Sequence, residues 1–243
     1  MSNKIDQYRR TFLGASGVTL AGLTVAPGVL LNSAQAKSKD QAISSSNRWG
    51  LLIDTNKCND GCTKCVTACN EEHGLRPNHG PETDSQWIRK VTLKNKSTGH
   101  VVNMPMMCQH CENPPCVDVC PTGASFKRDD GIVLVDKHIC IGCRYCMMAC
   151  PYKARNFIHE TLTDQLPVAP RGKGTVESCT MCMHKVDNGD GSTVCADACP
   201  EKAITFGDLK DPSSPISKEL AKHGGRQLRA ELGLNTAVRY QGL

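Results

Sequence analysis

The segment that decides the fold reads Cys140-Ile-Gly-Cys143-Arg-Tyr-Cys146-Met-Met-Ala-Cys150-Pro151. Two residues separate the first three cysteines from one another, three residues separate the third from the fourth, and a proline follows. Three thiolates at such intervals allow a tight loop to wrap one cubane-shaped iron–sulfur cluster, each thiolate meeting one iron. The segment therefore predicts a chain organised around metal-bound cysteines.

The remaining cysteines form three similar groups, and none of the sixteen is left over. The first group has an extra residue in its first gap and carries Asn70 where the rest have a proline. The second group has a longer middle gap, and the fourth has a long one. In chain order the groups are Cys58, Cys62, Cys65 and Cys69; Cys108, Cys111, Cys116 and Cys120; Cys140, Cys143, Cys146 and Cys150; and Cys179, Cys182, Cys195 and Cys199.

The last cysteine of each group has a predicted role of its own. In two-cluster ferredoxins the fourth cysteine of one run ligates the cluster of the other run. We expect this cysteine to lie where the chain turns into a helix. The proline that follows it would then occupy the first helical turn, where no amide donor is needed.

Zinc sites and disulfides account for the cysteines less well than iron–sulfur clusters do. A tetrahedral zinc site uses two Cys-x2-Cys pairs and rarely an uninterrupted run of four ending in proline. Disulfides would have to pair whole runs across the fold, because cysteines two residues apart are poorly placed to bridge each other. Iron–sulfur clusters account for all sixteen positions.

Composition and the remaining polar residues narrow the function further. The formal charge of +5 is too weak and too evenly spread to indicate a nucleic-acid partner. No histidine directly follows a Cys-x2-Cys pair, so the sequence has no c-type haem attachment site. We interpret His110 and His184 as polar packing residues, and the Glu71-Glu72 pair as a solvated helix face.

The first 36 residues have the pattern of an export signal. Tyr8-Arg9-Arg10-Thr11-Phe12-Leu13 is a twin-arginine pattern, a moderately apolar stretch follows, and Ala34-Gln35-Ala36 supplies a small-x-small cleavage site. This route carries folded proteins, which fits a cofactor assembled in the reducing cytoplasm before export. The alternative is an uncleaved N-terminal anchor. From residue 37 onward no apolar run approaches the roughly 18–20 residues that span a bilayer.

Short apolar runs place the predicted secondary structure around the cysteine groups. We expect strands at residues 49–54 and 132–136, each entering a group, and at residues 203–206, following the fourth group. Residues 87–93 and 100–104 read as the two strands of a hairpin. In the tail we expect one helix, at residues 217–223, stopped by Gly224-Gly225.

These motifs resemble the four-cluster ferredoxin-like iron–sulfur subunits that accompany molybdopterin oxidoreductases and NrfD-type membrane proteins. The resemblance covers the chain from residue 49 to its end. Three stretches resemble more narrowly the exported iron–sulfur subunit of Dsr-type membrane complexes in sulfur-metabolising prokaryotes. They are Asp54-Thr55-Asn56-Lys57-Cys58, Leu232-Gly233-Leu234-Asn235-Thr236 and Val238-Arg239-Tyr240-Gln241-Gly242-Leu243.

The resemblance implies an α+β fold of two dicluster ferredoxin modules related by a pseudo-twofold axis. It also implies four 4Fe–4S clusters with crossed ligation. The implied ligand sets are Cys58, Cys62, Cys65 and Cys199 (cluster 1); Cys69, Cys179, Cys182 and Cys195 (cluster 2); Cys108, Cys111, Cys116 and Cys150 (cluster 3); and Cys120, Cys140, Cys143 and Cys146 (cluster 4).

The expected domain organisation follows from these assignments. The segments are a twin-arginine signal peptide (1–36), a linker (37–47), an outer ferredoxin module (48–84 and 175–207), a hairpin insertion (85–105), an inner ferredoxin module with its connector (106–174) and a C-terminal docking tail (208–243).

The function expected from the resemblance is electron transfer without catalysis, on the periplasmic side of the membrane. The partners would be an NrfD-like, quinone-interacting membrane subunit and a multihaem cytochrome c. An alternative is the iron–sulfur subunit of a molybdopterin reductase for polysulfide, tetrathionate or thiosulfate. Because every cluster has four cysteines, no iron is left open to activate a substrate. A zinc-binding structural protein remains the alternative outside redox chemistry.

Overall fold

The structure, a computed structural model, describes residues 43–77, 79–80, 82–163 and 165–243. The predicted signal peptide at residues 1–36 and the start of the linker lie outside the described residues. The described residues from Ile43 to Leu243 form one compact unit.

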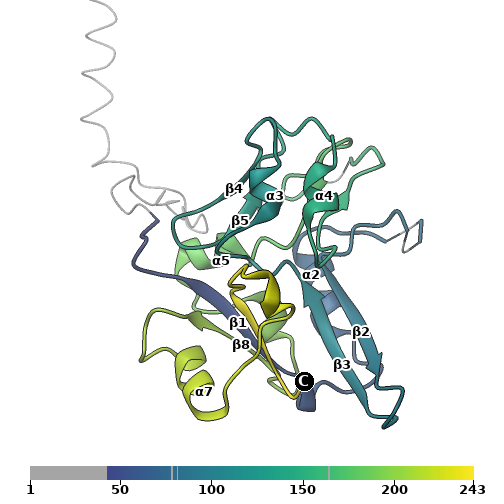
Figure 1. The fold of residues 1–243 in the computed structure, drawn as a ribbon. Helices are drawn as coiled ribbons and strands as arrows, with labels where there is room; N and C mark the ends of the chain where they lie inside the picture. Colours follow the sequence, from purple (N-terminus) through teal and green to yellow (C-terminus); the bar gives the residue numbers. More distant parts are fainter. Residues whose placement is uncertain (1–42, 78, 81, 164) are drawn as a thin grey trace, which may run out of the picture. The chain divides into compact units, whose positions relative to one another are not determined.

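A three-stranded sheet joins the segments that flank the first and fourth cysteine groups, which we call the outer part of the fold. Strand β1 (Trp49–Asp54) pairs antiparallel with β8 (Ile204–Asp208) and parallel with β9 (Val238–Gln241). The four residues from Gly50 to Ile53 are buried, which explains why β1 reads as a continuous apolar run and not as an alternating one. Figure 1 shows β1 and β8 side by side.

Two short helices accompany this sheet and carry thiols of different cysteine groups. Helix α2 (Lys64–Glu72) contains Cys65 and Cys69, and α6 (Val194–Asp197) contains Cys195. The two helices contact each other although they lie far apart in sequence. The first and fourth cysteine groups are therefore neighbours in space.

The second and third groups are paired in the same way. Helix α3 (Pro115–Asp118) contacts α4 (Tyr145–Ala149), and strand β4 (Ser125–Lys127) pairs antiparallel with β5 (Val133–Val135). Figure 1 shows these four elements together, apart from β1 and β8.

The prediction that a helix starts at each fourth cysteine is wrong. The helices precede the fourth cysteines: α3 ends before Cys120, α6 ends before Cys199, and α4 ends at Ala149. A proline follows each of these cysteines, and it cannot continue a helix because it lacks an amide and clashes with the preceding turn. Asn70 has no such restriction, and α2 continues past its fourth cysteine to Glu72.

The strands β2 (Ile88–Lys94) and β3 (Val101–Met107) form an antiparallel hairpin between the first two cysteine groups. The predicted hairpin is confirmed, although β3 runs three residues further than expected. It extends because Met104 and Met107 are buried in the core, so this end of the strand is held by packing. A smaller pair, β6 (Asn156–Phe157) with β7 (Val176–Glu177), links the third group to the fourth.

The predicted strands at 49–54, 132–136 and 203–206 correspond to β1, β5 and β8. The predicted tail helix is α7 (Pro215–His223), which begins two residues earlier than expected. The hydroxyl of Ser214 caps it by accepting a hydrogen bond from the Ser217 N–H at 3.2 Å, and Pro215 fills the first turn.

Three short helices and the last strand complete the fold. The helices are η2 (Thr55–Lys57), α5 (Met183–Asn188) and η3 (Ala230–Leu232). Strand β9 was not predicted from the sequence, yet Val238 and Tyr240 within it are fully buried. The Tyr240 hydroxyl donates to the Pro105 carbonyl at 3.1 Å and accepts from Gln109 Nε2 at 3.2 Å. The last strand therefore ties β1 to the end of the hairpin.

Candidate metal centre

All sixteen cysteines of the chain are described, and all are free thiols. Cys143 is the one exposed cysteine among them; the other fifteen are buried or half-buried. So many unpaired thiols inside one fold indicate a thiolate-binding cofactor, because sulfur ligands select zinc, copper(I) or iron–sulfur clusters.

Four of these thiols line one cavity, and Lys90 and Pro105 of the β2–β3 hairpin line it as well. The four thiols are Cys58, Cys62 and Cys65 from the first group and Cys199 from the fourth. The ammonium group of Lys90, on β2, donates to Cys58 Sγ at 2.8 Å. The cavity therefore joins thiols from opposite ends of the sequence, and its rim carries a cation.

A second set of thiols is buried between α2 and the fourth group. Burial raises the pKa of Cys69 well above its ordinary value, and the charges of Cys195 and Cys182 add to the rise. Burial does the same for the pKa of Cys179, where the charges of Cys69, Cys182 and Cys195 add to it. Cys69 and Cys179 both respond to the charges of Cys182 and Cys195, which places these four thiols near one another; Cys65 also acts on Cys69.

A third set combines the second group with the last cysteine of the third. Burial raises the pKa of Cys111 to about 12, and the charges of Cys108, Cys116 and Cys150 add to the effect. Cys150 thus lies with cysteines of another group, as Cys199 does.

The fourth set lines a small cavity and includes the exposed Cys143. Its thiols are Cys120, from the second group, and Cys140, Cys143 and Cys146, from the third. Gly142, between two of these cysteines, has φ +70°, and a Cβ there would overlap the Gly174 carbonyl oxygen. Glycine is needed for the loop to close.

Apolar side chains surround the exposed Cys143. Ile141 is 67% exposed and Met148 is 73% exposed, and Ile139 and Tyr145 are exposed as well. The cavity around Cys58 is lined by apolar residues such as Ile53 and Ile204 and by polar or charged residues that include Lys57, Asn59 and Glu201.

The donor sets fit iron–sulfur clusters. Each set offers four sulfur atoms, the full complement of a cubane with one protein ligand per iron. Burial raises the pKa of the Cys65 and Cys182 thiols to about 11 and that of Cys195 to about 12. Thiols in such places become thiolates when cationic iron is bound and protons are released.

Backbone amides support the thiolate form at the last cysteine of three groups. Ser125 N donates to Cys120 Sγ at 3.3 Å, and Ala203 N donates to Cys199 Sγ at 3.2 Å. A similar but longer contact joins Ala154 N to Cys150 Sγ at 3.5 Å. Such hydrogen bonds lower the cost of a negative sulfur and help set the potential of a bound cluster.

The two histidines interpreted as packing residues are held by hydrogen bonds. His110 Nδ1 accepts from the Val133 N–H at 3.0 Å and the residue is buried. His184 Nε2 lies 2.7 Å from Glu72 Oε1. Glu72 is thus engaged with α5, and the interpretation of the Glu71-Glu72 pair as a solvated face needs correction for this residue.

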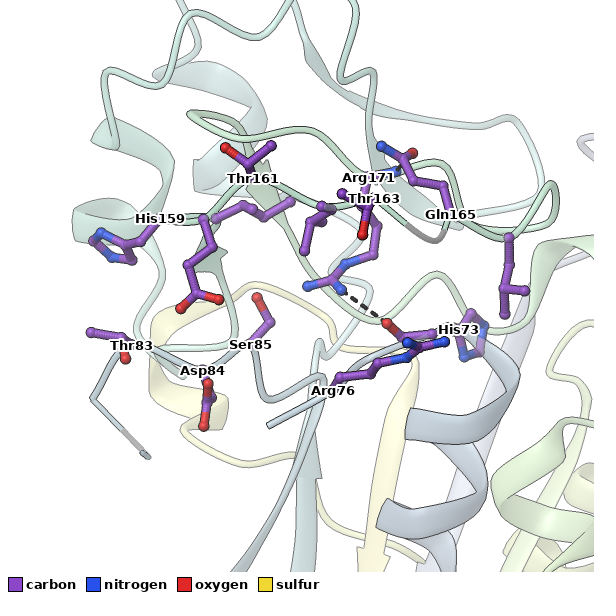
Figure 2. A pocket seen from close by; sticks show the side chains of 15 residues that line it. His73, Arg76, Thr83, Asp84, Ser85, His159, Thr161, Thr163, Gln165 and Arg171 are labelled. Carbon is purple, nitrogen blue, oxygen red and sulfur yellow. Dashed lines mark hydrogen bonds between the residues drawn. The ribbon is translucent and has the colours of Figure 1, made fainter. Parts of the chain in front are cut away.

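A cavity of about 180 Å³ has no cysteine in its lining, although His73, which lines it, lies 3.7 Å from Cys69 Sγ. Polar side chains including Arg76, Asp84, Ser85 and Gln165 form its walls. Figure 2 shows Arg171 reaching across it to donate to the Gly74 carbonyl, at 3.0 Å. The sequence pattern did not predict this cavity.

In the described part of the chain, no helix has both the length and the apolar character required to cross a bilayer.

Two models of the 4Fe–4S dicluster domain match the chain, at residues 56–124 and 99–209. The chain is 39% identical to the Hdr-like menaquinol oxidoreductase iron–sulfur subunit 1 of Archaeoglobus fulgidus, over 97% of this chain and 98% of the relative. It is 35% identical to a tetrathionate reductase subunit of Salmonella typhimurium, over 98% of this chain and 90% of the relative. It is 38% identical to NrfC of Escherichia coli, over 76% and 77% of the two chains.

The buried free thiols and the dicluster domain matches define an iron–sulfur protein of the ferredoxin class. The chain belongs to the family of iron–sulfur subunits with 4Fe–4S dicluster domains that serve quinone-interacting oxidoreductase complexes. Like its relatives in this family, it is an electron-transfer subunit and not a catalytic one.

Proposed function

We propose that the chain holds four 4Fe–4S clusters and relays electrons between a quinone-interacting membrane subunit and another redox protein. The observation that supports this proposal is the presence of sixteen free thiols, eight of which line two cavities in sets of four. When bound, the clusters supply one-electron redox chemistry. The chain's own residues bind them, shield most of their thiols from water and leave Cys143 at the surface.

The proposed ligand sets are those that the resemblance implies. The lining of two cavities supports the sets containing Cys199 and Cys120, respectively. Contact of α2 with α6 and of α3 with α4 supports two modules built from groups one and four and from groups two and three. A pseudo-twofold axis would relate the modules, with the β2–β3 hairpin as an insertion and residues 208–243 as a wrapping and docking tail.

The surface around Cys143 and the surface around Cys58 suit different partners. The apolar surface around Cys143 fits a lasting contact with an NrfD-like membrane subunit, since stable interfaces are apolar at their centre. The charged rim around Cys58 fits a multihaem cytochrome c, because complementary charges favour rapid association. The metabolic setting that we propose is sulfur-compound conversion in a Dsr-type complex.

A second candidate function is the iron–sulfur subunit of a molybdopterin reductase. The similarity to a subunit of tetrathionate reductase over nearly the whole chain supports it. In that case a molybdopterin subunit would bind the surface around Cys58.

The cofactor content is tested on the chain separated from its partners without oxygen, so that iron of other subunits does not enter the count. We expect about sixteen iron and sixteen acid-labile sulfide atoms per chain, because four cubanes hold four of each. The relay is tested on the complex isolated from membranes without oxygen. Adding a menaquinol analogue should then change the electron paramagnetic resonance spectrum of the clusters. Zinc in place of iron would contradict the cofactor assignment. Loaded clusters that do not respond to the quinol would contradict the quinone-linked relay.

The proposed periplasmic location rests on the leader. Changing Arg9 and Arg10 to lysine should leave the protein folded and loaded with clusters in the cytoplasm, because the arginine pair is an address read by a receptor. Fractionation of cells, followed by immunoblotting and iron analysis, measures this outcome. Unchanged export of the double variant would show that another route carries the protein.

A further inference from the structure

The guanidinium group of Arg155 is buried in the part of the fold that holds the second and third cysteine groups, which we call the inner part. The residue is 4% exposed and precedes β6. Its Nη2 donates to Cys116 Sγ at 3.1 Å, and its Nη1 donates to the Ser125 hydroxyl at 3.3 Å. A permanent positive charge therefore touches one of the proposed cluster ligands directly.

No carboxylate pairs with this guanidinium among the described residues. Two further arginines with well-buried side chains are paired: Arg171 with Glu177 at 2.7 Å, and Arg128 with Asp130 at 2.8 Å. A buried charge without a counter-charge is costly, so an arginine at this depth without a carboxylate needs an explanation.

Cysteine thiolates supply the negative charge that acts on Arg155. Burial disfavours the charged guanidinium, yet Cys116, Cys108 and Cys146 outweigh it and raise the pKa of Arg155. Cys116 and Cys108 belong to the proposed set of cluster 3, and Cys146 belongs to that of cluster 4. Arg155 thus contacts a ligand of cluster 3 directly, and it reaches cluster 4 through Ser125, whose backbone amide donates to Cys120 Sγ at 3.3 Å.

We propose that Arg155 is the counter-charge of the two inner clusters and raises their reduction potentials. This inference rests on the assignment of four clusters in the proposed function. A fixed cation stabilises the reduced cluster, which is the more negative form, more than the oxidised one. It therefore makes the inner pair easier to reduce.

The raised potentials give the relay an uneven profile. The inner pair lies in the part of the fold that carries the exposed Cys143. An electron on the chain would therefore rest on the inner pair, close to the apolar surface.

The test uses the full chain loaded with clusters and compares Arg155→Gln, which removes the charge, with Arg155→Lys, which keeps it. Redox titrations followed by electron paramagnetic resonance report each centre. We expect Arg155→Gln to lower the midpoints of the two inner centres and to leave the outer two unchanged. At a fixed potential the reduced-to-oxidised ratio of the inner centres should fall at least tenfold, which is about 59 mV for one electron. Arg155→Lys should stay close to the unmodified protein.

Lys90→Gln is the matched control, because Lys90 donates to Cys58 in the outer part of the fold. It should shift the centre of cluster 1 and none of the inner centres. Unchanged inner midpoints in a fully loaded Arg155→Gln protein, or an equal shift of all four centres, would overturn the inference.

Loss of clusters in Arg155→Gln is also decisive. If iron falls by about half and Arg155→Lys restores both the iron and the inner midpoints, the charge is required as proposed. If both variants lose iron equally, Arg155 acts through the shape of its hydrogen bonds and the inference is wrong. If the proposed function itself is wrong, the unmodified protein would contain far fewer than about sixteen iron atoms per chain. That outcome is distinct from either result for the variants.

Discussion

Replacing Cys199 with serine is expected to alter the spectroscopic centre to which Cys65 belongs and not the one to which Cys182 belongs. Cys199 follows Cys195 in the sequence by four positions, but it lines the cavity that also contains Cys58, Cys62 and Cys65. Cys182 instead lies with Cys69, Cys179 and Cys195. The reason is geometric: Cys195 lies within α6, whereas Cys199 follows the end of this helix and lines the cavity that contains Cys58.

Serine keeps the size of cysteine and offers an oxygen ligand, so the chain retains its fold around an altered centre. We expect Cys199→Ser and Cys65→Ser to shift or remove the same one of four signals. A lost cluster would reduce the iron content by about four atoms per chain. Cys182→Ser is the control and should change a different signal.

Redox titration of the three variants by electron paramagnetic resonance measures this result. If Cys199→Ser and Cys182→Ser change one signal together while Cys65→Ser changes another, each cysteine group would bind its own cluster. The proposed crossing of ligands between groups would then be wrong.

Truncating Tyr240 to alanine is expected to destabilise the protein severely. The side chain is fully buried in β9, and its hydroxyl bonds to Pro105 and Gln109. Removing a large aromatic side chain from a core costs roughly 3–5 kcal/mol. The loss would also uncouple β1 from the end of the hairpin. The first cysteine group lies in the chain between these two elements.

Tyr240→Phe separates packing from hydrogen bonding. It keeps the ring but leaves two buried polar partners without the hydroxyl, a cost of about 1–3 kcal/mol. The midpoint of denaturant unfolding, followed by the visible absorbance of the clusters without oxygen, should fall in the order unmodified protein, Tyr240→Phe, Tyr240→Ala. Tyr145→Ala is the control, because that tyrosine is 53% exposed. An unchanged midpoint in Tyr240→Ala would show that β9 contributes little to the stability of the fold.

Local features of the sequence were sufficient to predict much of this protein. The run from Cys140 to Pro151 predicted an iron–sulfur protein, and the dicluster domain matches confirm it. The strands β1, β5 and β8 and the β2–β3 hairpin were also predicted. All of these signals depend on residues close together in the chain, where spacing sets the direction of side chains.

The position of the short helices needed more than spacing. The prolines after Cys120, Cys150 and Cys199 suggested helix starts, but the helices precede these cysteines. Proline is compatible with a first helical turn and equally with the end of a helix. The packing of α3 on α4, and of α6 on α2, decides between the two.

The sequence by itself determined the number, type and local spacing of the thiols, because these depend on short-range backbone geometry. The tertiary structure decided which thiols gather, since Cys199 reaches Cys58 only after β8 pairs with β1. It also decided that Arg155 is buried against Cys116, and that β9 completes the central sheet. Burial and pairing between distant segments come from packing the whole chain, and no local pattern of residues contains them.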